Sequence, residues 1–127
     1  MALSSNKKIG QSDEAVKSYK AALKCEPKFV DAYNNLGNAL KDVGRHEEAI
    51  KSYNEVIRLR PDFVEAYNNL GISLNKLGQH EAAINSYNKA IELKPDSIEA
   101  HNNLGVTLND LGQHDAAITS ILSLIHI

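Results

Sequence analysis

Pairs of adjacent asparagines recur three times in this sequence, and their chemistry suits peptide binding. The pairs are Asn34–Asn35, Asn68–Asn69 and Asn102–Asn103, and Leu-Gly follows each of them. A carboxamide carries both hydrogen-bond donors and an acceptor, so it can bind the peptide group of another chain whatever that chain's side chains are. If stacking brings the pairs into rows along one surface, the rows predict a site for an extended peptide.

Further side chains share the helical face of the asparagine pairs, at spacings that suit one side of a helix. Together they form the predicted peptide-binding set: Asn34, Asn35, Asn38, Lys41, Asn68, Asn69, Asn75, Asn102, Asn103 and Asn109. An alternative stays open for the pairs, in which one asparagine of each pair is a structural residue bonded to a neighbouring helix.

Three histidines, His46, His80 and His114, also recur and raise the question of a zinc site. Stacked helix pairs place equivalent residues about 10 Å apart, whereas a zinc–nitrogen bond is about 2 Å long. We therefore interpret them as turn residues and expect no metal. The sequence contains neither a glycine-rich phosphate loop nor a nucleophile elbow. It predicts no catalytic residue and no cofactor.

A 34-residue repeat determines which elements position these side chains. Residues 30–63 aligned on residues 64–97 are identical at 20 of 34 positions. The same step relates the recurring prolines, glycines and tyrosines, which are Pro27, Pro61 and Pro95, then Gly10, Gly44, Gly78 and Gly112, then Tyr19, Tyr53 and Tyr87. A period of this length is typical of stacked helical hairpins.

Each repeat predicts two helices, the first over roughly 31–43 and the second over roughly 47–59. Gly44 should end the first helix because glycine readily adopts the left-handed conformation that follows a helix end. Pro61 should end the second because proline cannot donate the next helical hydrogen bond. Asp62 is then expected to cap the following helix through its side chain.

Small residues recur where two helices must approach closely. Gly37 lies inside a predicted helix, where glycine costs about 1 kcal/mol relative to alanine. We expect the ring of Tyr53 to lie over it, with the same arrangement in each repeat. Cys25 aligns with Leu59 and is expected to be a small core residue. Such hairpins cannot bury their apolar faces alone, so they must stack into an all-α solenoid.

The pattern of Leu36, Gly37, Ala49, Tyr53 and Pro61 within a 34-residue period resembles the tetratricopeptide repeat family. The resemblance covers roughly residues 6 to 121. It implies a right-handed superhelix of antiparallel helix hairpins and a protein–protein interaction scaffold that holds an extended peptide or a partner helix on its concave side. The scaffold itself would not be an enzyme.

The asparagine pairs also resemble the arrays attached to O-linked N-acetylglucosamine transferases. In that resemblance the ladder corresponds to Asn35, Asn69 and Asn103, and it implies contacts with a peptide's main chain. It also leaves an alternative function open, in which the array is the substrate-recruiting arm of a larger enzyme such as a glycosyltransferase.

Some tetratricopeptide domains hold a C-terminal carboxylate in a basic clamp, which requires cations on successive repeats. Lys41 is the only clear candidate here and Lys76 lies at the edge of this face, while Asp31, Glu65 and Glu99 stand where a clamp would need cations. The sequence therefore argues against a clamp.

Composition limits the remaining classes of function. The 127 residues suffice for one domain, and a net charge of −2 with a pI near 6.2 argues against nucleic-acid and membrane partners. One cysteine excludes an internal disulfide framework. We expect a cytoplasmic protein with a protein or peptide partner, and self-association through exposed solenoid ends stays open.

The two ends depart from the repeat. The predicted organisation is a partial repeat over 1–29 that supplies only a second helix, repeats over 30–63 and 64–97, and a repeat over 98–127 with an atypical end. Residues 122–127 read Leu-Ser-Leu-Ile-His-Ile, which resembles a translated transposon-end sequencing adapter. We hypothesise that these six residues are a cloning or assembly artefact. Resequencing the genomic locus tests this.

Overall fold

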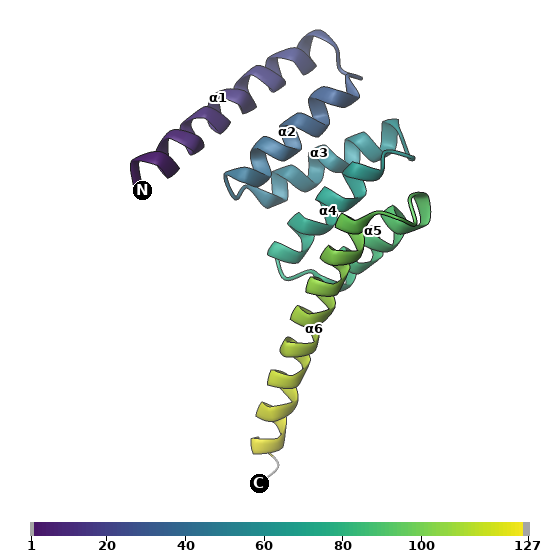
Figure 1. Cartoon of the computed structure of the whole chain (residues 1–127). Helices are drawn as coiled ribbons and strands as arrows, with labels where there is room; N and C mark the ends of the chain where they lie inside the picture. Colours follow the sequence, from purple (N-terminus) through teal and green to yellow (C-terminus); the bar gives the residue numbers. More distant parts are fainter. Residues whose placement is uncertain (1, 126–127) are drawn as a thin grey trace.

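The computed structural model describes residues 2–125, and the side chains of residues 10–115, 117–119 and 122. All six elements are helices, stacked in chain order (Figure 1). They are α1 (Ala2–Cys25), α2 (Val30–Asp42), α3 (His46–Leu59), α4 (Val64–Lys76), α5 (His80–Leu93) and α6 (Ile98–Ile125). The predicted all-α array of stacked hairpins is confirmed, with α2–α3 and α4–α5 as its two closed hairpins.

Glycine closes both hairpins, as the sequence predicts. Gly44 has φ 82° and Gly78 has φ 78°, in the left-handed region that glycine occupies without strain. In the first turn the amide of Arg45 donates to the carbonyl of Leu40 at 2.8 Å, and that of Gly44 donates to Lys41 at 3.0 Å. These are the two bonds of a Schellman motif, which satisfies carbonyls at the end of α2.

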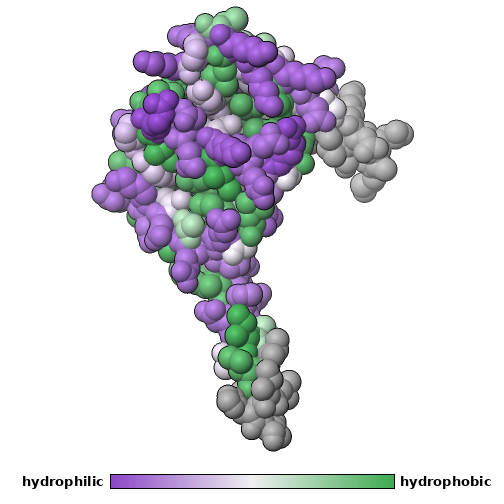
Figure 2. Space-filling view, turned by 180° about the vertical axis from the view of Figure 1, so that it is seen from behind, coloured by the Kyte–Doolittle hydropathy of each residue, from purple (hydrophilic) through white to green (hydrophobic). Residues whose placement is uncertain are grey.

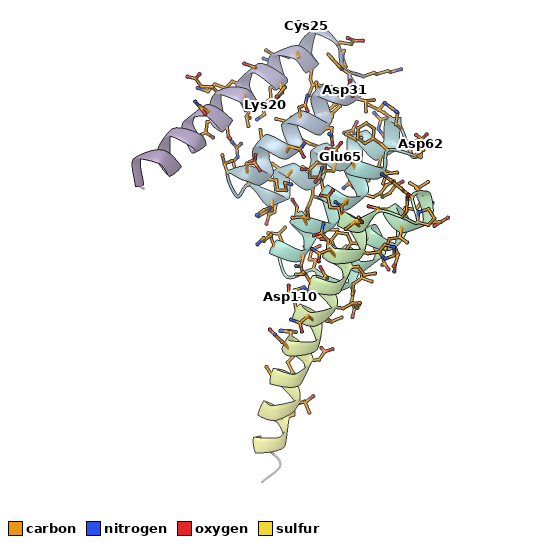
Figure 3. All side chains as sticks on the ribbon, viewed as in Figure 1. Lys20, Cys25, Asp31, Asp62, Glu65 and Asp110 are labelled. Atoms are coloured by element: carbon orange, nitrogen blue, oxygen red, sulfur yellow. The ribbon has the colours of Figure 1, made fainter. Side chains whose placement is uncertain are left out.

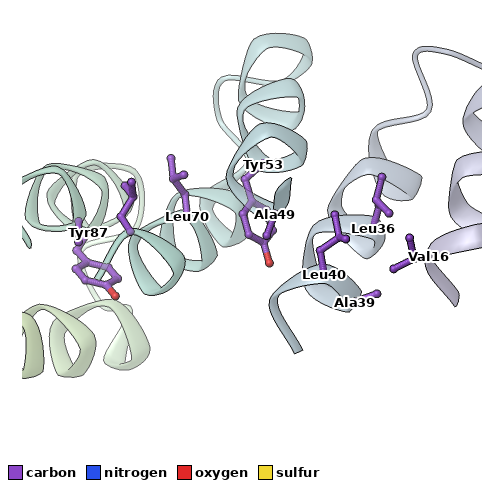
Figure 4. Packing of buried hydrophobic residues seen from close by; sticks show 10 residues of the cluster. Val16, Leu36, Ala39, Leu40, Ala49, Tyr53, Leu70 and Tyr87 are labelled. Carbon is purple, nitrogen blue, oxygen red and sulfur yellow. The ribbon is translucent and has the colours of Figure 1, made fainter. Parts of the chain in front are cut away.

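Two tyrosine rings in the core cover glycines of the facing helices. A Cβ placed on Gly37 would lie 2.6 Å from Cε1 of Tyr53, and one on Gly71 would lie 2.5 Å from Cε1 of Tyr87. Both rings are buried, and Figure 4 shows them with the aliphatic residues of the cluster, including Ala49. Only glycine lets each ring approach its facing helix so closely. This explains why glycine recurs inside these helices despite its low helix propensity.

Two local predictions are wrong. The residue that precedes α4 is Phe63, and no side chain caps that helix, so Asp62 does not act as its cap. The chain turns through Pro61 and Asp62 before the helix begins, one residue later than a cap at Asp62 requires. Cys25 is exposed, because it is the last residue of α1 and lies beyond the cover of the core.

The third unit does not form the expected hairpin. Helix α6 continues without a break through Gly112, and its second half extends away from the other helices (Figure 1). Leu111–His114 reads Leu-Gly-Gln-His, as does Leu77–His80, which forms the turn between α4 and α5. The position equivalent to Tyr53 and Tyr87 is Ile121, so no tyrosine is available to cover Gly105 and hold the helix pair closed.

The first helix continues past the repeat's turn position as well. Gly10 is the position equivalent to the turn glycines Gly44 and Gly78, yet α1 runs unbroken from Ala2. The projecting part of α6 exposes apolar side chains, with Ile118 44% and Leu122 51% exposed, and Figure 2 shows apolar surface there. The hypothesis about residues 122–127 is not tested by the structure, and residues 126 and 127 lie outside the described range. Within that range no helix is both long and apolar enough to cross a membrane.

Candidate functional site

The predicted binding residues lie on the first helix of each unit, which are α2, α4 and the first half of α6. These helices contact one another in sequence along the array, α2 with α4 and α4 with α6. We call the side that carries Asn35, Asn69 and Asn103 the first-helix surface. Its polar side chains are positioned by the same 34-residue period that places the glycines under the tyrosine rings.

The ladder of Asn35, Asn69 and Asn103 is not uniform in its surroundings. Asn35 is exposed, Asn69 is buried and Asn103 is half-buried. Lys41 Nζ donates to Asn69 Oδ1 at 3.4 Å, which links α2 to α4. Asn103 Nδ2 donates to Asn68 Oδ1 at 3.0 Å, which links α6 to α4. Each of these two ladder residues therefore uses one carboxamide atom to hold neighbouring repeats together.

The second row lies within the helix packing. Asn34 is 6% exposed and Asn68 is 3% exposed. Asn34 Oδ1 and Asn68 Nδ2 are buried and have no hydrogen-bond partner among the described residues. The bond from Asn103 to Asn68 matches the structural alternative for one asparagine of a pair. A binding role for the pairs stays a prediction.

A cavity of about 240 Å³ opens between α4 and α6 on the first-helix surface. Its lining includes the predicted residues Asn75 and Asn103, the apolar Ile72 and Val106, and Asp110. Asn75 Nδ2 donates to Asp110 Oδ2 at 3.0 Å, and Asn75 Oδ1 lies 2.5 Å from His80 Nδ1. The cavity thus combines apolar walls with carboxamide and carboxylate groups.

A second cavity of about 340 Å³ lies between α1 and α2. Asn35, Asn38 and Asp42 line it from α2, and Tyr19 lines it from α1. Asn38 Oδ1 accepts a hydrogen bond from the Tyr53 hydroxyl at 2.7 Å, and this bond fixes the orientation of the Asn38 carboxamide. The structure therefore brings Asn35 and Asn38 together at one cavity and Asn75 and Asn103 at the other.

Asn102 and Asn109, also in the predicted set, are exposed on α6 and line neither cavity. The prediction missed Asp110, which the repeat could have revealed because it stands where Asp42 and Lys76 stand in earlier units. It also missed the contact between His46 Nδ1 and Ser73 Oγ at 3.2 Å.

Positive charge gathers near His46. Partial burial lowers the pKa of its imidazole, and the nearby charges of Lys76 and Lys41 lower it further. Asp31 and Glu65 lie in the first turns of α2 and α4, and both are exposed (Figure 3). Acidic residues at helix N-termini interact favourably with the helix dipole.

The rings of His80 and His114 lie closer together than predicted, with centroids 6.3 Å apart. The straight course of α6 places His114 beside the turn at Gly78, where both histidines line a cavity of about 430 Å³. Among the described residues, no group of three or more histidine, cysteine, aspartate or glutamate side chains is arranged to hold a metal ion.

Comparison with known proteins agrees with this architecture. A family profile described as "TPR repeat" matches residues 7–44, 37–78 and 73–112. No curated protein matches the sequence. The crystal structure of MamA is similar, with 33% identity and a TM-score of 0.78. The match covers 87% of this chain and 64% of the MamA chain, so this chain spans less than two thirds of that structure.

Two structures of RPAP3 domains are also similar. The first TPR of Spaghetti (RPAP3) bound to the HSP90 peptide SRMEEVD has 26% identity and a TM-score of 0.78, covering 87% of this chain and 89% of that one. The first TPR domain of human RPAP3 has 25% identity and a TM-score of 0.80, covering 90% and 91%. The profile match, the 34-residue period and the glycine–tyrosine packing lead to one conclusion: the chain belongs to the tetratricopeptide repeat family.

Proposed function

We propose that the first-helix surface binds an extended peptide and contacts mainly the peptide's backbone. One observation carries the proposal. Asn103 uses its nitrogen for Asn68 and keeps its oxygen as an acceptor, and the exposed Asn35 has amide donors to offer. A peptide group offers one acceptor and one donor, which complements these two side chains.

The spacing of the repeats suits this arrangement. Packed helices lie about 8–10 Å apart, and an extended chain advances about 3.3 Å per residue. Neighbouring asparagines of the ladder would therefore contact peptide residues that are about three positions apart. Apolar side chains of such a peptide would face Ile72 and Val106 in the cavity between α4 and α6.

The RPAP3 domain shows one kind of ligand, the acidic peptide SRMEEVD from HSP90. Lys76 and Asp110 line the same cavity, Asp42 lines the other, and Lys41 already bonds to Asn69. We therefore propose a ligand held by its backbone with apolar side chains, and not one held by a carboxylate clamp. A partner helix would satisfy fewer carboxamides, because its peptide groups already bond to one another.

Selection of peptides from a displayed library of random dodecapeptides tests this proposal. The variant with Asn35→Ala, Asn69→Ala and Asn103→Ala should lose most of the affinity for the selected peptides in calorimetry. The matched control carries Asn54→Ala, Asn85→Ala and Asn88→Ala on exposed positions of α3 and α5, and should bind normally. Unchanged affinity in the ladder variant, with an intact helical spectrum, would rule out the ladder.

SRMEEVD serves as a second probe in the same experiment. We expect it to bind weakly or not at all, because the acidic Asp42 and Asp110 line the two cavities and would repel its carboxylates. Tight binding of SRMEEVD that the ladder variant retains would favour a clamp and contradict the proposal.

A second candidate function is a recruiting arm within a larger enzyme such as a glycosyltransferase. The asparagine ladder, which resembles the arrays of O-linked N-acetylglucosamine transferases, supports it. Sequencing the complete gene tests it, since a catalytic domain in the same reading frame is required. We propose a cytoplasmic location for either function, which imaging of a fluorescent fusion of the full-length protein would check.

A further inference from the structure

The two tyrosine rings of the core differ in what their hydroxyl groups meet. The Tyr53 hydroxyl donates to Asn38 Oδ1 at 2.7 Å. The residue equivalent to Asn38 in the next repeat is Ile72, whose side chain has no hydrogen-bonding group. Tyr87 is as deeply buried as Tyr53, with 1% and 0% of their surfaces exposed. The second hairpin therefore buries a tyrosine without the carboxamide oxygen that satisfies the first one.

A second hydroxyl lies near that of Tyr87. Thr107 on α6 is completely buried, and its Oγ1 has no hydrogen-bond partner of good geometry among the described residues. Burial raises the pKa of the Tyr87 hydroxyl, and the nearby Thr107 hydroxyl lowers it. A bond between the two hydroxyls would still leave one O–H group without an acceptor, because each carries its own donor. Helices α5 and α6 thus present hydrogen-bonding groups that the described residues do not satisfy.

The preceding repeat shows which partner Thr107 lacks. The equivalent Ser73 has its Oγ 3.2 Å from His46 Nδ1. The histidine equivalent to His46 is His80, and its Nδ1 contacts Asn75 Oδ1 instead. The unsatisfied threonine therefore follows from contacts inside the array, among α4, α5 and α6.

Tyr87 and Thr107 both line the cavity of about 240 Å³ between α4 and α6, whose apolar walls are Ile72 and Val106. All of its lining residues lie between positions 72 and 110, inside the array. Asn103 of the ladder lies at the same cavity and keeps its oxygen for a peptide N–H group. A peptide bound at Asn103 would therefore have a side chain within reach of the two hydroxyls.

We propose that this cavity is a specificity pocket for a carboxamide side chain, glutamine or asparagine, of the bound peptide. The inference rests on the proposed peptide binding and adds the identity of one peptide side chain. The carboxamide oxygen accepts from the Tyr87 hydroxyl, as Asn38 Oδ1 accepts from Tyr53 in the first hairpin. The amide group donates to Thr107 Oγ1, and the methylene groups lie against the apolar walls.

Other peptide side chains fit this cavity less well. Its lining carries one charge of each sign, on Lys76 and Asp110, so it favours a neutral group. A lysine ammonium has donors only and cannot accept from Tyr87. An apolar side chain would leave both hydroxyls buried without partners, which is unfavourable. A serine side chain is too short to cover the apolar walls.

Selection from the library of random dodecapeptides tests the pocket. Peptides selected by the wild-type chain should share glutamine or asparagine at one position, and its replacement by methionine should lower the affinity about tenfold. Tyr87→Phe and Ile72→Asn should both select peptides without this preference. The first variant removes the hydroxyl, and the second supplies the missing acceptor from inside the protein. Tyr53→Phe, the same change in the first hairpin, is the matched control and should keep the preference.

Titration with propionamide, a free carboxamide, gives a readout that needs no peptide. The methyl resonances of Thr107 and Val106 should shift in the wild-type chain and stay unchanged in Ile72→Asn. Equal shifts in both chains, or none in the wild type, would overturn the pocket. Selected peptides that depend on the asparagine ladder but share no carboxamide would overturn the pocket and leave the proposed function standing. A wild-type chain that selects no peptide would overturn both.

Discussion

The ring of Tyr53 lies so close to Gly37 that a Cβ on this glycine would be 2.6 Å from Cε1. The ring comes from α3 and the glycine from α2, so the contact holds the two helices of one hairpin together. Tyr87 and Gly71 repeat the contact in the next unit, whereas Gly105 has no described neighbour above it. This difference between closed and open units leads to the first two predictions.

Gly37→Ala and Gly71→Ala should each lower the free energy of unfolding by about 1–3 kcal/mol, the usual cost of overpacking a core. The added methyl group would displace a buried ring, and the gain in helix propensity of about 1 kcal/mol offsets only part of that cost. Urea denaturation measures the change. Gly105→Ala is the control and should be neutral or stabilising. A Gly37→Ala protein as stable as the wild type would show that the ring moves aside freely.

Gly44→Ala and Gly78→Ala should each destabilise the fold by about 1–2 kcal/mol, because both glycines have positive φ. The identical change at Gly112 should instead raise the stability of α6 by up to about 1 kcal/mol, since this glycine lies inside a helix. Thermal unfolding followed by circular dichroism compares the three variants. Destabilisation by Gly112→Ala equal to that of Gly78→Ala would mean that α6 bends in solution.

Stability should fall as the solution is acidified through the pKa range of His46. Its pKa in the fold is lowered by burial and by Lys76 and Lys41, so the unfolded chain binds the proton more strongly. The contribution is complete above the unfolded value of 6.5 and is lost progressively below it. Urea midpoints between neutral and mildly acidic pH measure this loss, which His46→Gln should reduce. The exposed His114 provides a control in His114→Gln, and equal pH dependence in both variants would contradict the assignment.

The bond between Asn103 and Asn68 should couple α6 to α4. Asn68→Ala and Asn103→Ala should each destabilise the chain, and a double-mutant cycle should give a coupling of about 0.5–1.5 kcal/mol. Asn35 is exposed, so Asn35→Ala should change stability by less than about 0.5 kcal/mol. Additive effects of the Asn68 and Asn103 changes would show that the bond contributes nothing to stability.

The sequence predicted the interior of the array well because each feature there rests on contacts that repeat. The turn at Gly44 and the ring of Tyr53 over Gly37 both follow from residue types at fixed spacing. The last unit was predicted poorly because its conformation depends on the tyrosine–glycine contact, which Gly105 lacks among the described residues. Leu111–His114 forms helix although the same four residue types form a turn at Leu77–His80.

The sequence predicted that the asparagines form rows on the first helices, but not which hydrogen bonds their side chains make. The 34-residue step placed the asparagines on the first helices, as found. It did not indicate that Lys41 would bond to Asn69 while Asn103 bonds to Asn68, because the residues around equivalent positions differ between units. The row of Asn34 and Asn68 proved buried, since a position on the helix face also depends on how closely the next helix packs.

The two copies of Leu-Gly-Gln-His show that this tetrapeptide does not encode its own shape. At residues 77–80 it reverses the chain, and at 111–114 it carries the chain straight on. The same tetrapeptide therefore forms a turn or a helix according to the residues that pack against it. If such an array were cut or joined at a different residue, its last unit would adopt a different conformation. Where repeats are trimmed or fused for engineering, the boundary itself becomes a structural variable.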